Sequence, residues 1–399
     1  MIVLTGADLV LPDGIRHGGT LVIDDGRILE VSEGARAASA GSDQIDLRDH
    51  FIVPGFIDVH VHGVEGIDAL DGRDAVPGIA ARLPKYGVTS FCPTTVACDP
   101  LALRQVLDSI ARARSLSAPA GARVLPAHLE SNFINPAYRG AQPEHCLRTP
   151  PAPGIPRVPR HGGFDGNDIL EEIDRGGDAV KIVTLAPELA GADDLIRHLV
   201  ARGRRVALGH SGATLEQGRA AIAAGARHAT HLFNRMPPLG HRDPGLVAAV
   251  LESDDIAAEI ICDGVHVHPA MIHLTVTSKH PERVMAITDG TAGAGLPEGS
   301  HSKLGGSRIT VAKSAAYLED GTLAGSIATM NKIFRLLVTD VALSPVAAAR
   351  LCSTTPADEL GLQGFGRIAK DAIADLVVLD RHFNVKQTYI AGRTVYSRR

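Results

Sequence analysis

The feature that most constrains the fold is an alternation of short β-rich runs with helix-like stretches through the middle of the chain. The helix-like stretches include Leu101–Ala113, Asp193–Ala201 and Leu215–Ala224. Strands that alternate with helices indicate parallel βα units, and eight parallel strands close into a barrel. The chain therefore predicts an α/β fold with a (β/α)8 TIM barrel, whose strands are Phe51–His62, Val88–Thr95, Arg123–Glu130, Ala179–Ala186, Arg205–His210, His228–Phe233, Ala257–Cys262 and Val284–Thr288.

An open, doubly wound sheet is the alternative fold for such a pattern. Its nucleotide-binding version needs a GxGxxG turn after a strand or a P-loop, and the sequence shows neither. The barrel is therefore the favoured prediction.

Both ends of the chain are β-rich and differ from the middle. Short strand-like runs alternate with turn signals such as Pro12-Asp13-Gly14 near the N-terminus, and Asp375–Leu379 reads as a strand near the C-terminus. We expect a small β-sandwich domain formed from residues 1–53 and 365–399, and a barrel domain over residues 54–364. The prolines of Thr149–Arg160 predict a long irregular loop that could act as a lid.

Charge and cysteine content exclude several classes of protein. The net charge of -5 argues against nucleic-acid and membrane partners, because both need a basic face. No apolar run approaches the roughly 20 residues of a membrane span. The five cysteines form no CxxC pair, so a disulfide framework or a thiolate zinc site is not expected, and a cytoplasmic location is.

Metal-preferring side chains recur at the C-terminal ends of the predicted strands. In His60-Val61-His62, alternation along the strand places both imidazoles on one face. A lone buried histidine is more often a hydrogen-bonded core residue, but a full ordered set at the catalytic face of a barrel is hard to obtain by packing alone. Such a set suits a divalent metal such as zinc or iron. The predicted ligands are His60, His62, Glu130, His210, His231 and Asp289.

Other polar groups lie around these strand ends. Asp289 could be a ligand or a general base and acid beside the metal, and we favour the second role. Asp58, two residues before His60, is expected to support the ligands rather than to bind metal. In the loops that follow, His266 could polarise a carbonyl group. Arg242 could hold a phosphate or could be a solvated surface arginine.

With these residues the chain resembles the N-acetylglucosamine-6-phosphate deacetylase family, a branch of the amidohydrolase superfamily. The HxH motif is shared across the superfamily, whereas the HLFN…MPPL and DGxH stretches are more specific to this branch. The matching stretches run through nearly the whole predicted barrel: Pro54–Gly63, His128–Glu130, Thr184–Glu188, Gly209–Ser211, Thr230–Asn234, Met236–Leu239, Asp263–His266 and Leu323–Ser326.

The resemblance implies a role for each matching position. Glu130, His210 and His231 resemble the ligands of the principal metal, and His60 with His62 resembles a pair that holds a second ion. Asp289 is implied as the catalytic acid and base, and His266 as a group that polarises the acetyl carbonyl. Arg242 is implied as a phosphate contact presented to the neighbouring subunit, which implies a homodimer. The remaining implied substrate contacts are Ala141, Gln142, Asn234, Arg235, Leu323, Ala324 and Gly325.

The expected reaction is therefore hydrolysis of N-acetylglucosamine-6-phosphate to glucosamine-6-phosphate and acetate, by metal-activated water with Asp289 as base and acid. Two departures from the family lie beside the expected sugar pocket. Ser131-Asn132 replaces the usual Gly-Pro, and Arg235 replaces a small residue. They keep open an amidohydrolase that acts on a different N-acyl or cyclic amide substrate. A non-enzymatic scaffold is a further alternative, which the filled ligand positions disfavour.

Overall fold

The computed structural model describes residues 1–34, 43–115, 121–151 and 163–398. Its largest element is a barrel of parallel strands, each hydrogen-bonded to the next. The last strand returns to the first through a parallel bridge between Gly290 and Val61 and a 3.0 Å hydrogen bond from Asp289 N to His60 O. The predicted TIM barrel is confirmed, with strands β6 (Phe56–Val61), β9 (Val88–Thr95), β11 (Ala127–Glu130), β12 (Val180–Leu185), β13 (Arg205–Leu208), β14 (His228–Ala229), β15 (Ala257–Ile261) and β16 (Val284–Ile287).

Two of the helices predicted from the sequence begin at side chains that cap them. Asp99 accepts hydrogen bonds from the first backbone amides of α2, and Thr214 and Gln217 form a reciprocal capping box at the start of α5. The three helices predicted from the sequence are confirmed to within one residue as α2, α4 and α5. The longer helices are α1 (Ala75–Arg82), α2 (Pro100–Arg114), α3 (Gly166–Arg175), α4 (Ala192–Ala201), α5 (Leu215–Ala223), α6 (Gly245–Glu252), α7 (Pro269–Lys279) and α8 (Met330–Thr339).

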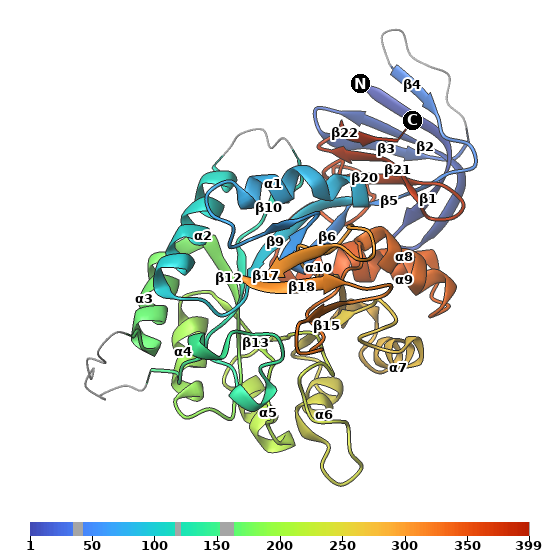
Figure 1. The fold of residues 1–399 in the computed structure, drawn as a ribbon. Helices are drawn as coiled ribbons and strands as arrows, with labels where there is room; N and C mark the ends of the chain where they lie inside the picture. The colour runs from blue at the N-terminus through green and yellow to red at the C-terminus, as the bar shows by residue number, and fades with distance from the viewer. Residues whose placement is uncertain (35–42, 116–120, 152–162, 399) are drawn as a thin grey trace.

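A separate sheet combines strands from both ends of the chain, and both termini lie in it at the upper right of Figure 1. It runs in the order β22-β21-β20-β5-β1-β2-β3, with β4 paired to β1. Its own apolar core includes Leu4, Leu21 and Tyr389. The strands are β1 (Ile2–Leu11), β2 (Gly14–Asp24), β3 (Arg27–Ser32), β4 (Asp43–Asp46), β5 (Phe51–Pro54), β20 (Leu376–Leu379), β21 (Val385–Ile390) and β22 (Arg393–Ser397).

The predicted strand Phe51–His62 is in fact two strands in two different sheets. Its first part, β5, pairs with β1 and β20 in the terminal sheet, whereas β6 pairs with β9 in the barrel. Gly55 separates them, and a side chain there would collide with Thr89 of β9. The glycine therefore lets the chain pass from one sheet to the other against the barrel wall.

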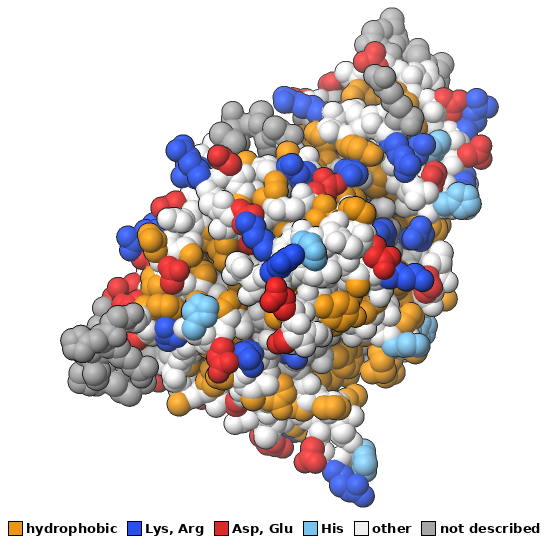
Figure 2. All heavy atoms as spheres, in the orientation of Figure 1, with side chains coloured by type: hydrophobic (Ala, Val, Ile, Leu, Met, Phe, Trp, Pro, Cys, Tyr) orange, Lys and Arg blue, Asp and Glu red, His pale blue; other side chains and the backbone are white. Residues whose placement is uncertain are grey.

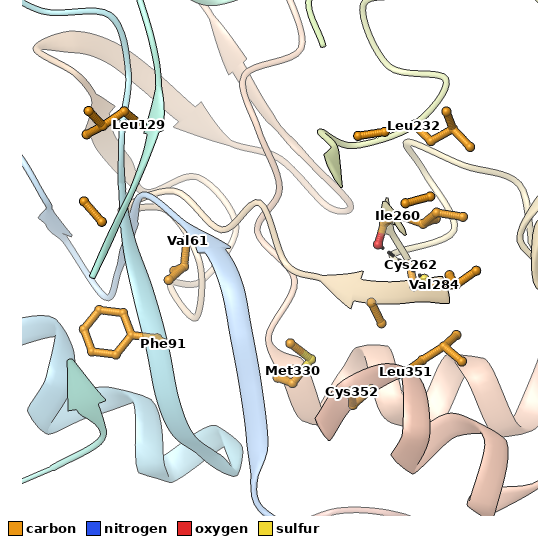
Figure 3. Packing of buried hydrophobic residues seen from close by; sticks show 14 of the residues in the cluster. Val61, Phe91, Leu129, Leu232, Ile260, Cys262, Val284, Met330, Leu351 and Cys352 are labelled. Atoms are coloured by element: carbon orange, nitrogen blue, oxygen red, sulfur yellow. Dashed lines mark hydrogen bonds between the residues drawn. The ribbon is translucent and has the colours of Figure 1, made fainter. Parts of the chain in front are cut away.

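The main apolar core lies between the barrel strands and the helices around them. In Figure 3, Val61, Phe91 and Leu129 come from β6, β9 and β11, and Met330 and Leu351 come from helical segments. Close packing of this kind resists displacement. The strand ends that carry the polar residues are therefore anchored in a rigid wall.

A three-stranded antiparallel sheet that follows β16 was not predicted from the sequence. It consists of β17 (His301–Leu304), β18 (Ser307–Val311) and β19 (Ala316–Leu318) and crosses the middle of Figure 1. Residues 152–160 of the predicted irregular loop lie outside the described residues.

The face drawn in Figure 2 carries basic and acidic side chains in alternation rather than one basic patch. Among the described helices, none has both the length and the apolar character needed to cross a membrane.

Candidate metal centre and active site

Three of the predicted ligands meet at the C-terminal ends of β11, β13 and β14. Glu130 ends β11, His210 follows β13 and His231 follows β14. Glu130 Oε1 lies 2.7 Å from His210 Nε2 and 2.8 Å from His231 Nε2, and the two ring nitrogens are 3.1 Å apart. All three side chains are buried. They form one group able to hold a metal ion.

A second group lies directly beside the first. His60 Nε2 and His62 Nε2 are 3.2 Å apart, and Asp289 Oδ1 lies 3.3 Å from the former and 3.2 Å from the latter. His62 Nε2 is also 3.5 Å from Glu130 Oε2, which links the two groups. The structure thus brings together all six ligands predicted from the sequence.

The hydrogen bond behind the His210 ring shows that a cation fits between His210 and Glu130. Nδ1 of His210 lies 2.8 Å from the carbonyl oxygen of Tyr138, which can only accept a hydrogen bond. The proton of a neutral His210 ring is therefore on Nδ1, and the lone pair on Nε2 faces the Glu130 carboxylate. The lone pair of His210 Nε2 and the oxygen Glu130 Oε1 are then both acceptors, only 2.7 Å apart. They repel each other unless a positive charge lies between them. A divalent ion supplies that charge, and these nitrogen and oxygen ligands suit one.

Charge rather than burial sets the protonation of this centre. Burial acts to raise the pKa of the Glu130 carboxyl, but His210, His231 and His60 hold it well below its usual range. Burial acts to lower the pKa of His60, yet the carboxylates of Glu259 and Asp289 raise it to about 10. A cation that binds at His60 therefore replaces a proton.

The backbone is strained where it presents three of the ligands. His210, His231 and Asp289 have φ values of 48°, 28° and 48°, in the left-handed region that residues other than glycine rarely adopt. Strain of this kind persists only where the surrounding structure imposes it, and it gathers at functional sites. The turns after β13, β14 and β16 therefore aim these side chains across the barrel mouth.

Two neighbouring residues have supporting contacts. Asp58 is fully buried and accepts a hydrogen bond from Thr288 Oγ1 at 2.5 Å, and burial raises its pKa to about 7. His128 uses both ring nitrogens, one with Val59 O at 3.1 Å and one with Thr184 Oγ1 at 2.8 Å. Burial lowers the pKa of His128 to about 3, so its ring is neutral.

A pocket opens above the metal-binding groups, and most of the predicted substrate contacts line it. Ala324 is buried in a small apolar cluster instead, and Arg242 is exposed and does not line the pocket. Two lining residues, Ile261 and Leu304, were not predicted from the sequence. The full lining is His62, Glu130, Ala141, Gln142, His210, His231, Asn234, Arg235, Ile261, His266, Asp289, Leu304, Leu323 and Gly325.

Two pocket residues have contacts that fix their orientation. His266 Nδ1 lies 2.7 Å from Asp263 Oδ2, so its other ring nitrogen remains for the pocket. Gln142, predicted as a substrate contact, donates a hydrogen bond to Glu130 Oε2 and accepts one from Ala97 N at 2.7 Å. Gln142 therefore orients the Glu130 carboxylate as well as lining the pocket.

The residues that depart from the family pattern fall into two kinds. Ser131 donates to Thr184 O at 2.5 Å, and Asn132 donates to the carbonyls of Cys98 and Cys146 at 2.7 Å each. Both are buried and neither lines the pocket. Arg235 is exposed and does line it. Only Arg235 therefore changes the chemistry of the pocket.

Comparison with known proteins agrees with this geometry. Residues 51–395 match the Amidohydrolase family. The N-acetylglucosamine-6-phosphate deacetylase of Mus musculus is 38% identical over 96% of this chain and 94% of its own length. The N-acetylgalactosamine-6-phosphate deacetylase of Escherichia coli O157:H7 is 34% identical over 86% of this chain and 87% of its own. A point variant of the N-acetyl-D-glucosamine-6-phosphate deacetylase of Mycobacterium smegmatis, in complex with N-acetyl-D-glucosamine-6-phosphate, is 32% identical, with a TM-score of 0.88 over 99% of both chains.

Histidines and carboxylates gather at the mouth of a parallel barrel, where enzymes with this fold carry their active sites. The match over residues 51–395 shows that the chain belongs to the amidohydrolase family. The similarity extends over nearly the full length of its relatives and includes the terminal sheet. Within that family, the chain falls in the N-acetylglucosamine-6-phosphate deacetylase branch.

Proposed function

We propose that this protein removes the acetyl group of N-acetylglucosamine-6-phosphate, giving glucosamine-6-phosphate and acetate. The observation that carries the proposal is the meeting of two metal-binding groups with His266 and Arg235 around one pocket. The names of the relatives given above state that they act on amino-sugar phosphates, and in this chain the predicted ligands meet beside one pocket.

The roles of the residues follow from their positions. A divalent ion held by Glu130, His210 and His231, with a second at His60 and His62, would polarise the acetyl carbonyl and make water more acidic. Asp289 belongs to the second group and also lines the pocket, so it accepts the proton of the attacking water and returns it to the departing amine. Zinc or iron suits these ligands.

His266 is placed to stabilise the negative charge that develops on the acetyl oxygen. With Asp263 accepting from Nδ1, the ring can carry a second proton on the nitrogen that faces the pocket and donate it as a hydrogen bond. One such donor is often worth about 3–4 kcal/mol of barrier. Its removal should lower turnover rather than metal content.

The phosphate is expected at the outer rim of the pocket. Arg235 supplies a cation there within the subunit, beside Asn234, Ala141, Leu323 and Gly325. Arg242 lies on an exposed loop away from its own pocket, which fits a contact with the site of a neighbouring subunit in a homodimer. We place this metabolic activity in the cytoplasm.

The test is the release of acetate and free amine by metal-loaded protein. N-acetylglucosamine-6-phosphate, its galactosamine epimer and the unphosphorylated sugar are compared at equal concentration. We expect rapid release from a phosphorylated sugar, lost on chelation and restored by metal, and the ratio of the epimers identifies the sugar. No release from any of the three by metal-loaded protein would refute the proposal and would favour another N-acyl or cyclic amide substrate.

A further inference from the structure

One carboxylate inside the barrel was not singled out from the sequence and has no role in the reaction described so far. Glu259 lies in β15, where Ala258 and Ile260 pack outward against the helices, whereas Ala257 and Ile261 belong to the interior cluster. Side chains alternate along a strand, so Glu259 faces the barrel interior. It is completely buried, beneath the metal-binding groups.

Both oxygens of Glu259 are held by groups from other strands. Oε2 lies 2.9 Å from His60 Nδ1 and accepts a 3.3 Å hydrogen bond from the backbone amide of His231. Oε1 lies 2.7 Å from His228 Nε2. Glu259 therefore contacts one ligand of each metal-binding group, His60 by its side chain and His231 by its backbone.

These contacts decide which nitrogen of His60 is free. A carboxylate accepts the Nδ1 proton, so the lone pair of a neutral His60 ring lies on Nε2, towards His62 and Asp289. A carboxylate behind a ligating imidazole fixes the ring and makes it a better ligand.

A third ion at Glu259 does not fit the contacts. His60, His128 and Glu259 lie close enough to form a metal group. Both nitrogens of His128, however, already have protein partners, and Nδ1 of His60 is hydrogen-bonded to Glu259. The carboxylate is therefore occupied by hydrogen-bond donors.

We propose that Glu259 is a positioning residue that orients His60 towards the His60–His62–Asp289 group and thereby sets the affinity of that group for its ion. The proposal rests on the metal-dependent function proposed above. It is tested by metal binding without substrate, so a protein that holds its ions but acts on another amide would leave this result intact.

The decisive variant is Glu259→Gln, which keeps the size of the side chain but places an amide NH2 against one of its donors. Apo-protein is titrated with Co²⁺ or Mn²⁺, and bound metal is counted by elemental analysis. Electron paramagnetic resonance reports coupling between two neighbouring Mn²⁺ ions. We expect wild-type protein to bind two ions, and the variant to bind the second about 10–100-fold more weakly while the ion of Glu130, His210 and His231 is retained.

The matched control is Glu359→Gln. Glu359 is another buried glutamate, which pairs with Arg205 and Arg283 at the opposite end of the barrel. A general loss of stability would affect both variants, whereas loss of the second ion and of the Mn²⁺ coupling should occur only at Glu259. If Glu259→Gln does not fold, Glu259→Asp keeps the charge but shortens the reach, and it should weaken the same ion.

Two results would overturn the proposal. One is a folded Glu259 variant that binds both ions with wild-type affinity and shows the same Mn²⁺ coupling. The other is wild-type protein that binds a single ion throughout the titration, because there would then be no second ion for Glu259 to support.

Discussion

Replacing Asp289 by asparagine should separate the chemical step from the fold. The residue has a φ of 48°, and asparagine adopts the left-handed region more readily than most residues. Its backbone bonds, from its own amide to His60 O at 3.0 Å and from Ser326 N at 2.8 Å, do not depend on the side chain. We therefore expect the Asp289→Asn variant to fold with its backbone in place.

The magnitude follows from what the carboxylate contacts. General acid–base catalysis contributes about 10²–10⁴-fold, which is roughly 3–5 kcal/mol of barrier at about 1.4 kcal/mol for each factor of ten. Asp289 Oδ1 lies 3.2 Å from His62 and 3.3 Å from His60, so an ion at that group should be weakened. Glu130, His210 and His231 form their group without Asp289 and should keep their ion.

The assay is acetate release at saturating substrate together with metal content. Both kcat and kcat/KM should fall by about the same factor, because the lost interaction acts only in the transition state. Asp68→Asn is the matched control, since Asp68 is a nearby buried carboxylate bonded to Leu70 N and Gly305 N and lies outside the metal groups. Turnover of Asp289→Asn within tenfold of wild type would refute the acid–base role.

Three further changes test other parts of the molecule. Glu130→Gln removes the carboxylate shared by His210 and His231, so metal analysis should show loss of the ion held by these three residues. A variant that keeps this ion at full stoichiometry would contradict the role of Glu130 as a ligand. Arg235→Ala should raise KM for the phosphorylated sugar by about 10–150-fold, which corresponds to the loss of a hydrogen bond to a charged group. KM for the unphosphorylated sugar should not change, and an equal rise for both sugars would show that Arg235 does not bind the phosphate. Gly55→Ala forces a methyl group against Thr89 and should lower the free energy of unfolding by about 1–3 kcal/mol, which is measured as a lower unfolding temperature. Gly14→Ala is the control, because a methyl group there meets open space and should leave the unfolding temperature unchanged.

The barrel could be predicted from the sequence because its signal is local and repeated. Most of the strands are short β-rich runs, and most of the stretches between them have helical character. The predicted strand Val88–Thr95 has the same bounds as β9. The sequence predicts a domain boundary within this run, at residues 53–54, but not the break of the strand at Gly55. The apolar pattern continues through the glycine, and only pairing with β1 and β20 shows that β5 belongs to another sheet. The domain boundaries at residues 53–54 and 364–365 stay predictions.

The site shows the same difference between local and distant information. His60 and His62 form a motif within three residues, and the other ligands occur in recognisable short stretches at strand ends. Glu259 has no such signal, because it is a single acid within the apolar run Ala257–Ile261, and its partner His60 is 199 residues away in the chain. Only closure of the barrel shows that this acid lies behind a metal ligand.

The residues that depart from the family pattern do not affect the pocket equally, because only one of them lines it. Ser131 and Asn132 are both buried, and their side chains donate to the backbone carbonyls of Thr184, Cys98 and Cys146. Their role is to hold the chain after β11. Arg235 instead presents its charge at the pocket, beside the positions expected to contact the substrate. Any difference in substrate between this chain and its relatives should therefore depend on Arg235, and the ratio of KM values for phosphorylated and unphosphorylated sugar in Arg235→Ala measures it directly.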